Sequence, residues 1–248
     1  MNPESVTRAA IVTGASRGIG GLIAQRLAAD GWNLTLCARS PEPLEGLAAD
    51  LRAHYGIRVK PVPGDMSNED DVVRVADTHA DTFGRLDALV LNAGMGSIGP
   101  LAEFPARRFD KLFAVNVRSA YVLVQRTLPL LRETANGPTS PKVIAVSSMT
   151  GLVGEPLNSA YGATKAALTS LCETLNTEES ERGITATAVC PGYVATDMTA
   201  SLADKVSPQA MIDPVDVAEV VVSLTRLSGS VVIPSIAMTR PGPHLWRA

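Results

Sequence analysis

The chain has 248 residues, enough for one large α/β domain, and we expect residues 1–248 to form a single domain because no linker or composition shift divides them. A hydrophobic content of 46% with only 4% aromatic residues fits a buried parallel sheet with a core of Ala, Val, Leu and Ile. The formal net charge of −3 argues against nucleic-acid binding, and no apolar run approaches the ~18 residues of a membrane span.

Strand and helix patterns alternate along the whole chain, which predicts right-handed β-α-β units and a doubly wound parallel sheet of about seven strands with helices on both faces. We expect strands near residues 9–13, 33–38, 57–62, 87–91, 142–147, 184–190 and 230–234. We expect helices near residues 18–30, 42–54, 68–83, 104–133, 159–182 and 214–227.

A glycine-rich turn, Thr13-Gly-Ala-Ser-Arg-Gly-Ile-Gly20, joins the first strand to the first helix. This context is typical of a dinucleotide-binding, Rossmann-type unit, although the spacing is G-x-x-x-G-x-G. Gly14 permits the tight turn, Gly18 lets backbone N–H groups reach a pyrophosphate, and Gly20 lets helix and sheet pack closely. The helix N-terminus then attracts the phosphates.

Tyr161 and Lys165 are four residues apart, so in a helix both side chains leave from one face. A phenol titrates near pH ~10, and an ammonium one turn away should pull that pKa toward neutrality. A serine at the end of the preceding strand would hydrogen-bond the oxygen that the tyrosine protonates. This pattern predicts a proton-transfer site for a carbonyl or an alcohol, which is useful only beside a hydride donor or acceptor.

Taken together, the motifs resemble those of the short-chain dehydrogenase/reductase family. They are the glycine-rich turn, Asn92-Ala-Gly94, Ser148, Tyr161-x-x-x-Lys165 and Pro191-Gly192, in the family's order between about Ala9 and Met198. Any one of them alone is a weak signal.

The resemblance implies a catalytic set of Asn116, Ser148, Tyr161 and Lys165. Alternation sends Ser147 and Ser148 to opposite sides, and the thirteen residues between Ser148 and Tyr161 match the family, so Ser148 is expected to face the substrate. In the family an asparagine at the position of Asn116 binds a water that links the lysine to solvent. Alternatively, Asn116 is a core amide that satisfies a helical kink.

The resemblance also implies a cofactor site, in which Asp65 and Met66 would contact the adenine while Val194 and Thr196 would contact the nicotinamide. Asp65 also fits a turn or N-cap before the next helix. The full expected set is Gly14, Ser16, Arg17, Gly18, Ile19, Gly20, Arg39, Ser40, Asp65, Met66, Asn92, Ala93, Gly94, Tyr161, Lys165, Pro191, Gly192, Val194 and Thr196.

The cofactor is predicted to be NADP(H), because the second strand ends at Ala38 without the Asp that would bind ribose hydroxyls in an NAD enzyme. Arg39 and Ser40 follow, and a guanidinium binds a 2′-phosphate by charge-assisted hydrogen bonds. Arg17 would approach the same phosphate from the other side. Alternatively, Arg39 is a solvated turn residue.

The three cysteines lack C-x-x-C spacing and are expected to be reduced packing residues of a cytoplasmic protein. The N-terminus contains Glu4 and shows no signal peptide. His54, His79 and His244 are isolated, so we expect surface or capping roles and no metal site.

We therefore expect an NADP(H)-dependent oxidoreductase that interconverts a ketone or aldehyde and an alcohol, with a 3-oxoacyl thioester or a broad range of carbonyls as the small-molecule substrate. The rival class is a dinucleotide-binding sensor or scaffold without turnover; an epimerase or dehydratase is disfavoured by the chain length and the glycine spacing. The small residues Gly162, Ala163, Ala166 and Ala167 suit a homodimer or homotetramer, or packing within the chain. Residues 199–211 are the expected substrate lid, and the C-terminal tail from Arg240 departs from the family pattern.

Overall fold

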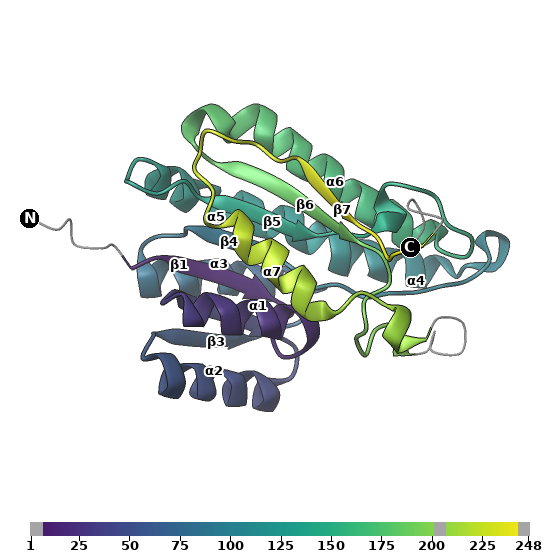
Figure 1. The fold of residues 1–248 in the computed structure, drawn as a ribbon, viewed down its shortest axis with the longest axis horizontal. Coiled ribbons are helices and arrows are strands. Elements are labelled where there is room, and N and C mark those ends of the chain that lie inside the picture. The colour runs from purple at the N-terminus through teal and green to yellow at the C-terminus, as the bar shows by residue number, and fades with distance from the viewer. Residues whose placement is uncertain (1–6, 201–206, 243–248) are drawn as a thin grey trace, which may run out of the picture.

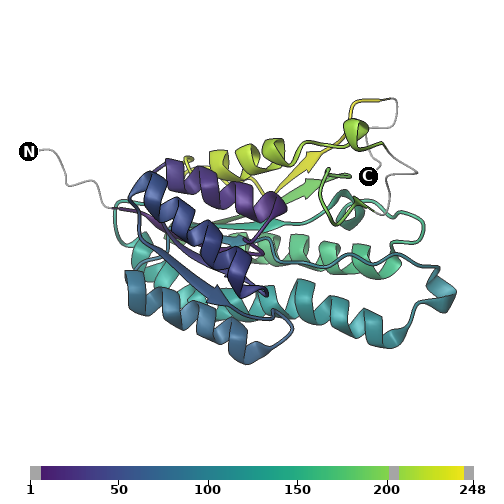
Figure 2. The same ribbon diagram turned by 90° about the horizontal axis from the view of Figure 1, so that it is seen from below.

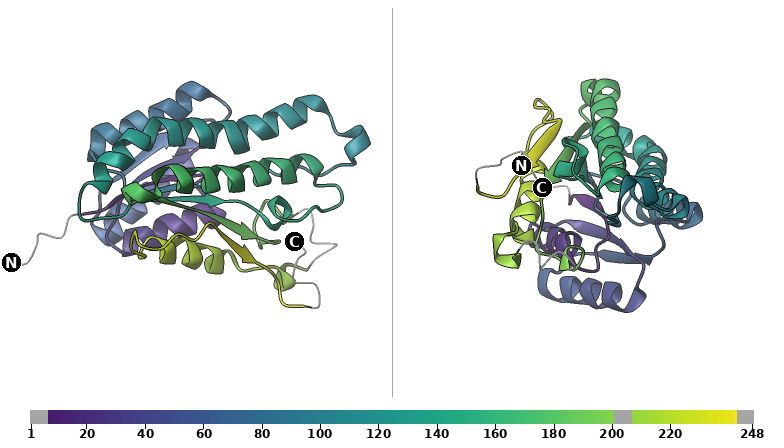
Figure 3. Two further views of the ribbon diagram at one scale, coloured as in Figure 1. Left: turned by 90° about the horizontal axis from the view of Figure 1, so that it is seen from above. Right: turned by 90° about the vertical axis from the view of Figure 1, so that its right-hand side faces the viewer.

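Seven parallel strands form a single sheet in the order β3-β2-β1-β4-β5-β6-β7 in the computed structural model, which describes residues 7–200 and 207–242. The predicted doubly wound architecture is confirmed, with helices on both faces (Figures 1, 2 and 3). His244, the end of the tail and the middle of the expected lid lie outside the described residues.

The strands are β1 (Ala9–Thr13), β2 (Asn33–Ala38), β3 (Val59–Pro63), β4 (Ala88–Leu91), β5 (Lys142–Val146), β6 (Thr185–Pro191) and β7 (Ser235–Met238). The helices are α1 (Gly18–Ala29), α2 (Pro41–Tyr55), α3 (Glu69–Phe83), α4 (Ala106–Phe113), α5 (Ser119–Ala135), α6 (Ser159–Glu179) and α7 (Pro214–Leu224).

Successive side chains along each strand point to opposite faces of the sheet, so the core consists of two layers. Ala10 and Val12 of β1 belong to the cluster under α1, α2 and α7, whereas Ile11 between them belongs to the cluster under α3, α5 and α6. Because both faces are covered, β1 is buried along its whole length and reads as a continuous apolar run. All strands are parallel, so their carboxyl ends meet at one edge, on the right in Figure 1.

Two predicted elements are wrong in their bounds. The single helix expected over 104–133 is divided into α4 and α5 by a π-helical segment, Ala114–Arg118, that contains Asn116. The last strand begins at Ser235, not at residue 230. Val231 and Ile233 instead line a small cavity with the end of α7, so this apolar run covers the sheet before pairing with β6 begins.

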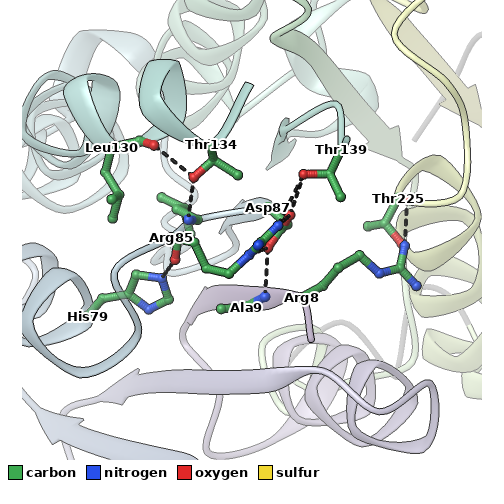
Figure 4. Close-up of polar contacts among 10 residues, drawn as sticks. Arg8, Ala9, His79, Arg85, Asp87, Leu130, Thr134, Thr139 and Thr225 are labelled. Atoms are coloured by element: carbon green, nitrogen blue, oxygen red, sulfur yellow. Dashed lines mark hydrogen bonds and ion pairs between the residues drawn. The ribbon is translucent and has the colours of Figure 1, made fainter. Parts of the chain in front are cut away.

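The amino-terminal edge of the sheet is closed by a polar network around Asp87 (Figure 4). The Asp87 carboxylate accepts hydrogen bonds from the Ala9 amide at 2.8 Å, from the Arg85 guanidinium at 2.6 and 2.8 Å, and from the Thr139 hydroxyl at 2.7 Å. Burial alone would raise the pKa of Asp87, but the bonds from Arg85 and Ala9 hold it below its usual value. Every carboxylate oxygen here is used to join strand ends, so this edge is structural.

The surface role expected for His79 is wrong, because its side chain is completely buried. It lies on the core-facing side of α3 with Val72, Val75 and Ala76, at helical spacing that the sequence already displayed. Its Nε2–H donates to the Arg85 carbonyl at 2.9 Å, so Nδ1 accepts from the Thr35 hydroxyl at 2.8 Å. Burial lowers the pKa of His79 to about 4. His54 is exposed, as expected.

Candidate active site

The candidate site lies where the strand order reverses, at the carboxyl ends of β1 and β4. In a doubly wound sheet this switch point is the usual position of a ligand-binding crevice. The glycine-rich turn leaves β1 here, and Asn92-Ala93-Gly94 leaves β4 beside it.

The turn and the β4 exit are locked together by Thr13 and Asn92. The Asn92 side-chain amide donates to the carbonyls of Thr13 at 2.9 Å and Gly14 at 3.2 Å. The Thr13 hydroxyl accepts from the backbone amides of Asn92 and Ala93, both at 3.0 Å. Thr13 is therefore a positioning residue, which the sequence analysis did not select. The pattern that could have identified it is a polar residue at the end of a buried strand.

Gly14 and Gly20 show why the turn needs glycine. Gly14 has a φ of +66°, which favours glycine, and a Cβ on Gly20 would overlap the Gly14 carbonyl and the Asn92 amide. Helix α1 therefore starts in direct contact with the turn. Its N-cap residue makes no side-chain capping bond and its first turn carries no acidic residue, which leaves the N-terminal amides available to an anion.

The two arginines expected at the cofactor site lie on different segments, Arg17 in the turn after β1 and Arg39 directly after β2. Arg17 forms an exposed ion pair with Asp197 at 2.9 Å, and its neighbour Gly18 lies beside Thr196, so the segment after β6 reaches across to the glycine-rich turn. Arg39 follows β2, on the other side of β1 in the sheet, and is exposed. Asp197, which the sequence analysis did not select, pairs with Arg17, one of the two arginines expected near the 2′-phosphate.

Asp65 makes a turn in front of α3. Its carboxylate accepts from the Ser67 amide and hydroxyl, both at 2.8 Å, and these bonds, with smaller contributions from the charges of Lys111 and Arg39, hold its pKa below the usual value. The N-cap of α3 is Asn68, whose side chain accepts from the Asp70 amide at 3.0 Å. Of the two local roles considered for Asp65, the turn is therefore the one adopted, and Met66 beside it is buried.

Ser148 and Tyr161 meet at the end of β5. The Ser148 hydroxyl is buried, accepts from the Thr150 amide at 3.2 Å and hydroxyl at 3.0 Å, and forms a hydrogen bond with Tyr161 that lowers the phenol pKa. Ser147 points the other way, as alternation predicts, and donates to the Lys165 carbonyl at 2.9 Å.

The pKa of Tyr161 is not lowered by Lys165, as the sequence had predicted, but raised. Burial raises the pKa of Tyr161 to about 12, only partly offset by Ser148, and burial lowers the pKa of Lys165 to about 8. The Lys165 ammonium donates to the Val146 carbonyl at 2.8 Å and lies 5.6 Å from the centroid of the Tyr161 ring. It therefore does not lower the phenol pKa in this state, which is the correction to that expectation.

Asn116 sits in the π-helical segment, a feature often found at functional sites. Its Oδ1 accepts from the Met95 amide at 2.8 Å, and its Nδ2 donates to the Met95 carbonyl and the Thr164 hydroxyl, both at 3.0 Å. The amide thus ties the loop after β4 to α6. Beside it lies a cavity large enough for about one water molecule, lined also by Thr13 and Ala93.

The segment after β6 holds Val194 and Thr196 in a fixed turn. Val194 pairs with Ile212, and the Thr199 hydroxyl donates to the Val194 carbonyl at 2.5 Å while accepting from the Thr196 amide at 3.2 Å. Thr199 was predicted only as the start of the lid. In the structure it also organises the turn.

Residues 8–207 match the family described as short chain dehydrogenase. The chain belongs to the short-chain dehydrogenase family. It is 33% identical over 207 residues to the 3-oxoacyl-[acyl-carrier-protein] reductase of Staphylococcus aureus, covering 83% of this chain and 82% of that protein.

Two solved structures show that the similarity extends to the three-dimensional fold. An alcohol dehydrogenase of Thermococcus sibiricus complexed with 5-hydroxy-NADP gives a TM-score of 0.85 at 29% identity, covering 95% of this chain and 99% of that one. A 3-ketoacyl-(acyl-carrier-protein) reductase of Brucella melitensis complexed with NADH gives 0.84 at 25% identity, covering 95% and 97%.

This short-chain dehydrogenase is an oxidoreductase acting on CH–OH or C=O groups, as the sequence predicted. Within the part of the chain that the structure describes, no helix has the length and apolarity needed to cross a membrane. Nor do residues 7–200 and 207–242 bring together three or more side chains that could hold a metal ion.

Proposed function

We propose that this protein is an NADP(H)-dependent reductase of carbonyl compounds, with Tyr161 as the proton donor. The observation that carries the proposal is the hydrogen-bonded pair of buried Ser148 and half-buried Tyr161 beside Lys165, next to a glycine-rich turn built to receive an anion. Bound NADPH supplies the hydride.

The residues present fit a dinucleotide. A Cβ on Gly94 would lie 3.5 Å from the Asn116 Oδ1 and 3.6 Å from the Lys165 Nζ, so the glycine keeps these polar atoms open to a ribose. The uncapped N-terminus of α1 suits the pyrophosphate. Arg39, exposed at the end of β2 where no carboxylate stands, suits a 2′-phosphate, which favours NADP(H) over NAD(H).

In reduction, Ser148 hydrogen-bonds the carbonyl oxygen and Tyr161 protonates it. With a pKa of about 12 the phenol is fully protonated at neutral pH, and Lys165, with a pKa of about 8, is mostly charged. Both groups are thus in the state needed for reduction. Lys165, which donates to the Val146 carbonyl here, would hold the ribose of a bound dinucleotide, and its charge beside the phenol would favour departure of the proton.

We favour an acyl substrate with an apolar chain, and a 3-oxoacyl thioester is the leading candidate because relatives bear that name. Exposed apolar side chains gather on the loops at the carboxyl edge of the sheet. They are Ile98, Leu101, Leu152, Val153, Leu157 and Met198. Such a rim suits burial of a hydrocarbon chain during binding.

We also propose that residues 1–248 act as one domain and assemble as a cytoplasmic homodimer or homotetramer. The three cysteines are buried and free, which fits a reducing compartment. Gly162 packs against the Thr150 carbonyl within the chain, whereas Ala163 and Ala166 face outward from α6 and leave a thin surface for a second copy.

The test is Tyr161→Phe, assayed by NADPH oxidation with a panel of 3-oxoacyl thioesters, ketones and aldehydes. Loss of the acid should lower kcat by ~10²–10⁴-fold while NADPH still binds. Tyr55→Phe, on an exposed tyrosine at the end of α2, is the matched control. Near-normal turnover of Tyr161→Phe would refute the assignment, and a wild-type protein that binds NADPH without oxidising it would be a sensor.

A further inference from the structure

The loop between β5 and α6 carries a carboxylate whose two oxygens join separate parts of the site. The Tyr193 hydroxyl donates to one Glu155 oxygen at 2.8 Å, and the Asn158 side-chain amide donates to the other at 3.2 Å. Tyr193 lies one residue before Val194 in the turn after β6. Asn158 immediately precedes α6, three residues before Tyr161. Glu155 therefore connects the proposed nicotinamide side of the crevice to the start of the helix that bears the acid.

The same loop holds a strained residue. Leu157 has a φ of 66°, and among the described residues no other non-glycine residue has a positive φ. This conformation is unfavourable for a residue with a side chain and persists only where the surroundings impose it. Its carbonyl accepts from the Gly99 amide at 2.9 Å, in the loop after β4. Loops from three strands thus converge on residues 155–158.

The Tyr193 ring is also held from a fourth segment. The Arg240 guanidinium, two residues after β7, lies 5.5 Å from the centroid of the ring, within the range of a cation–π contact. Burial and the Glu155 carboxylate raise the pKa of Tyr193 to about 12, so its hydroxyl stays a hydrogen-bond donor throughout the neutral range. Tyr193 can therefore donate to Glu155 across the whole neutral range.

We propose that Glu155 is a positioning residue for hydride transfer, which acts by holding the turn of Val194 and Thr196 at a fixed distance from Tyr161 through Tyr193 and Asn158. This inference rests on the proposed function, since it assumes a nicotinamide between the turn and the helix. Hydride and proton must reach one C=O group together, and a misplacement of ~1 Å costs about 10²-fold in rate. Binding of the phosphates and adenine happens elsewhere, so Glu155 sets the rate and not the affinity for the dinucleotide.

The experiment compares Tyr193→Phe, Glu155→Ala, the double variant and Glu155→Gln in the full chain. Tyr193→Phe removes one hydroxyl and keeps the ring under Arg240. For Tyr193→Phe and Glu155→Ala we expect a fall in kcat of about 10-fold or more, an isotope effect from 4-deuterated NADPH that rises toward its intrinsic value, and little change in the NADPH dissociation constant. The double variant should be little worse than Glu155→Ala, because both substitutions break the bond between Tyr193 and Glu155, and Tyr193→Phe further removes only the smaller contribution of the Asn158 side chain at the Tyr193 hydroxyl. Glu155→Gln keeps one acceptor and should recover part of the rate.

Glu181→Gln, an exposed glutamate after α6, is the control with the same charge change. A turnover-independent readout is the fluorescence lifetime of bound NADPH, which should shorten in Tyr193→Phe as the nicotinamide gains freedom. Additive effects of the two substitutions, or lower thermal stability with an unchanged kcat and lifetime, would overturn the inference. A wild-type protein that binds NADPH but reduces no carbonyl would defeat the proposed function instead, and the lifetimes would still decide whether Glu155 fixes the nicotinamide.

Discussion

Gly20→Ala is the substitution whose cost the structure specifies most directly. Gly20 occupies the third position of α1, where alanine would by itself favour the helix by about 1 kcal/mol. The added methyl, however, would overlap the Gly14 carbonyl oxygen and the Asn92 amide, and would lie 2.9 Å from the Gly14 carbonyl carbon. Two of the three nearest atoms belong to backbone, so they cannot rotate away.

The magnitude follows from three contributions. Overpacking of this kind costs about 2 kcal/mol. Displacing the Asn92 amide weakens its two bonds to the turn, at about 1 kcal/mol each. After the helix-propensity gain is subtracted, Gly20→Ala should lower the free energy of unfolding by about 3 kcal/mol. It should also weaken dinucleotide binding, since the turn must open to admit the methyl group.

The assay is urea unfolding followed by far-UV circular dichroism, with midpoints compared between variants. Gly46→Ala is the control, because Gly46 is exposed in the middle of α2 and nothing lies within 4 Å of its added Cβ. The control should raise the stability by about 1 kcal/mol, opposite in sign to Gly20→Ala. Equal or higher stability of Gly20→Ala than of the wild type would refute the close-packing argument for this turn.

Two further predictions concern the cofactor and acid stability. Arg39→Ala should raise the dissociation constant for NADPH by about 10–100-fold and leave that for NADH almost unchanged, because a charge-assisted bond to the 2′-phosphate is lost. Arg17→Ala should change the dissociation constants for NADPH and NADH by the same factor, because this side chain is paired with Asp197. If fluorescence titration of Arg17→Ala showed weaker binding of NADPH alone, this division of roles between the two arginines would be wrong. His79 has a folded-state pKa of about 4 against 6.5, so the unfolded state binds more protons between those values and stability is lost as the pH falls through them. The stability advantage of the wild type over His79→Gln should therefore shrink by about 3 kcal/mol between pH 7 and about pH 4, and a constant difference across that range would show that the buried imidazole is not the source.

Sequence reasoning was sufficient for the fold class and the family, and it supplied the predicted set of site residues. Buried parallel strands give continuous apolar runs, and the glycines of Thr13–Gly20 and the Tyr161–Lys165 spacing are local patterns that need no knowledge of distant contacts. Ser148 could be chosen over Ser147 because strand alternation is also local.

Features that depend on partners far apart in the chain required the three-dimensional structure. The side-chain amide of Asn116, in the π-helical segment, bonds to the backbone of Met95 in the loop after β4, and β7 pairs with β6 from Ser235 onward, not from the start of the apolar run. The raised pKa of Tyr161 reflects burial, because the lysine one turn away donates to the Val146 carbonyl and does not offset it. Likewise Arg17 meets Asp197, 180 residues later, and Glu155 meets Tyr193, because the carboxyl ends of parallel strands bring distant loops to one edge of the sheet.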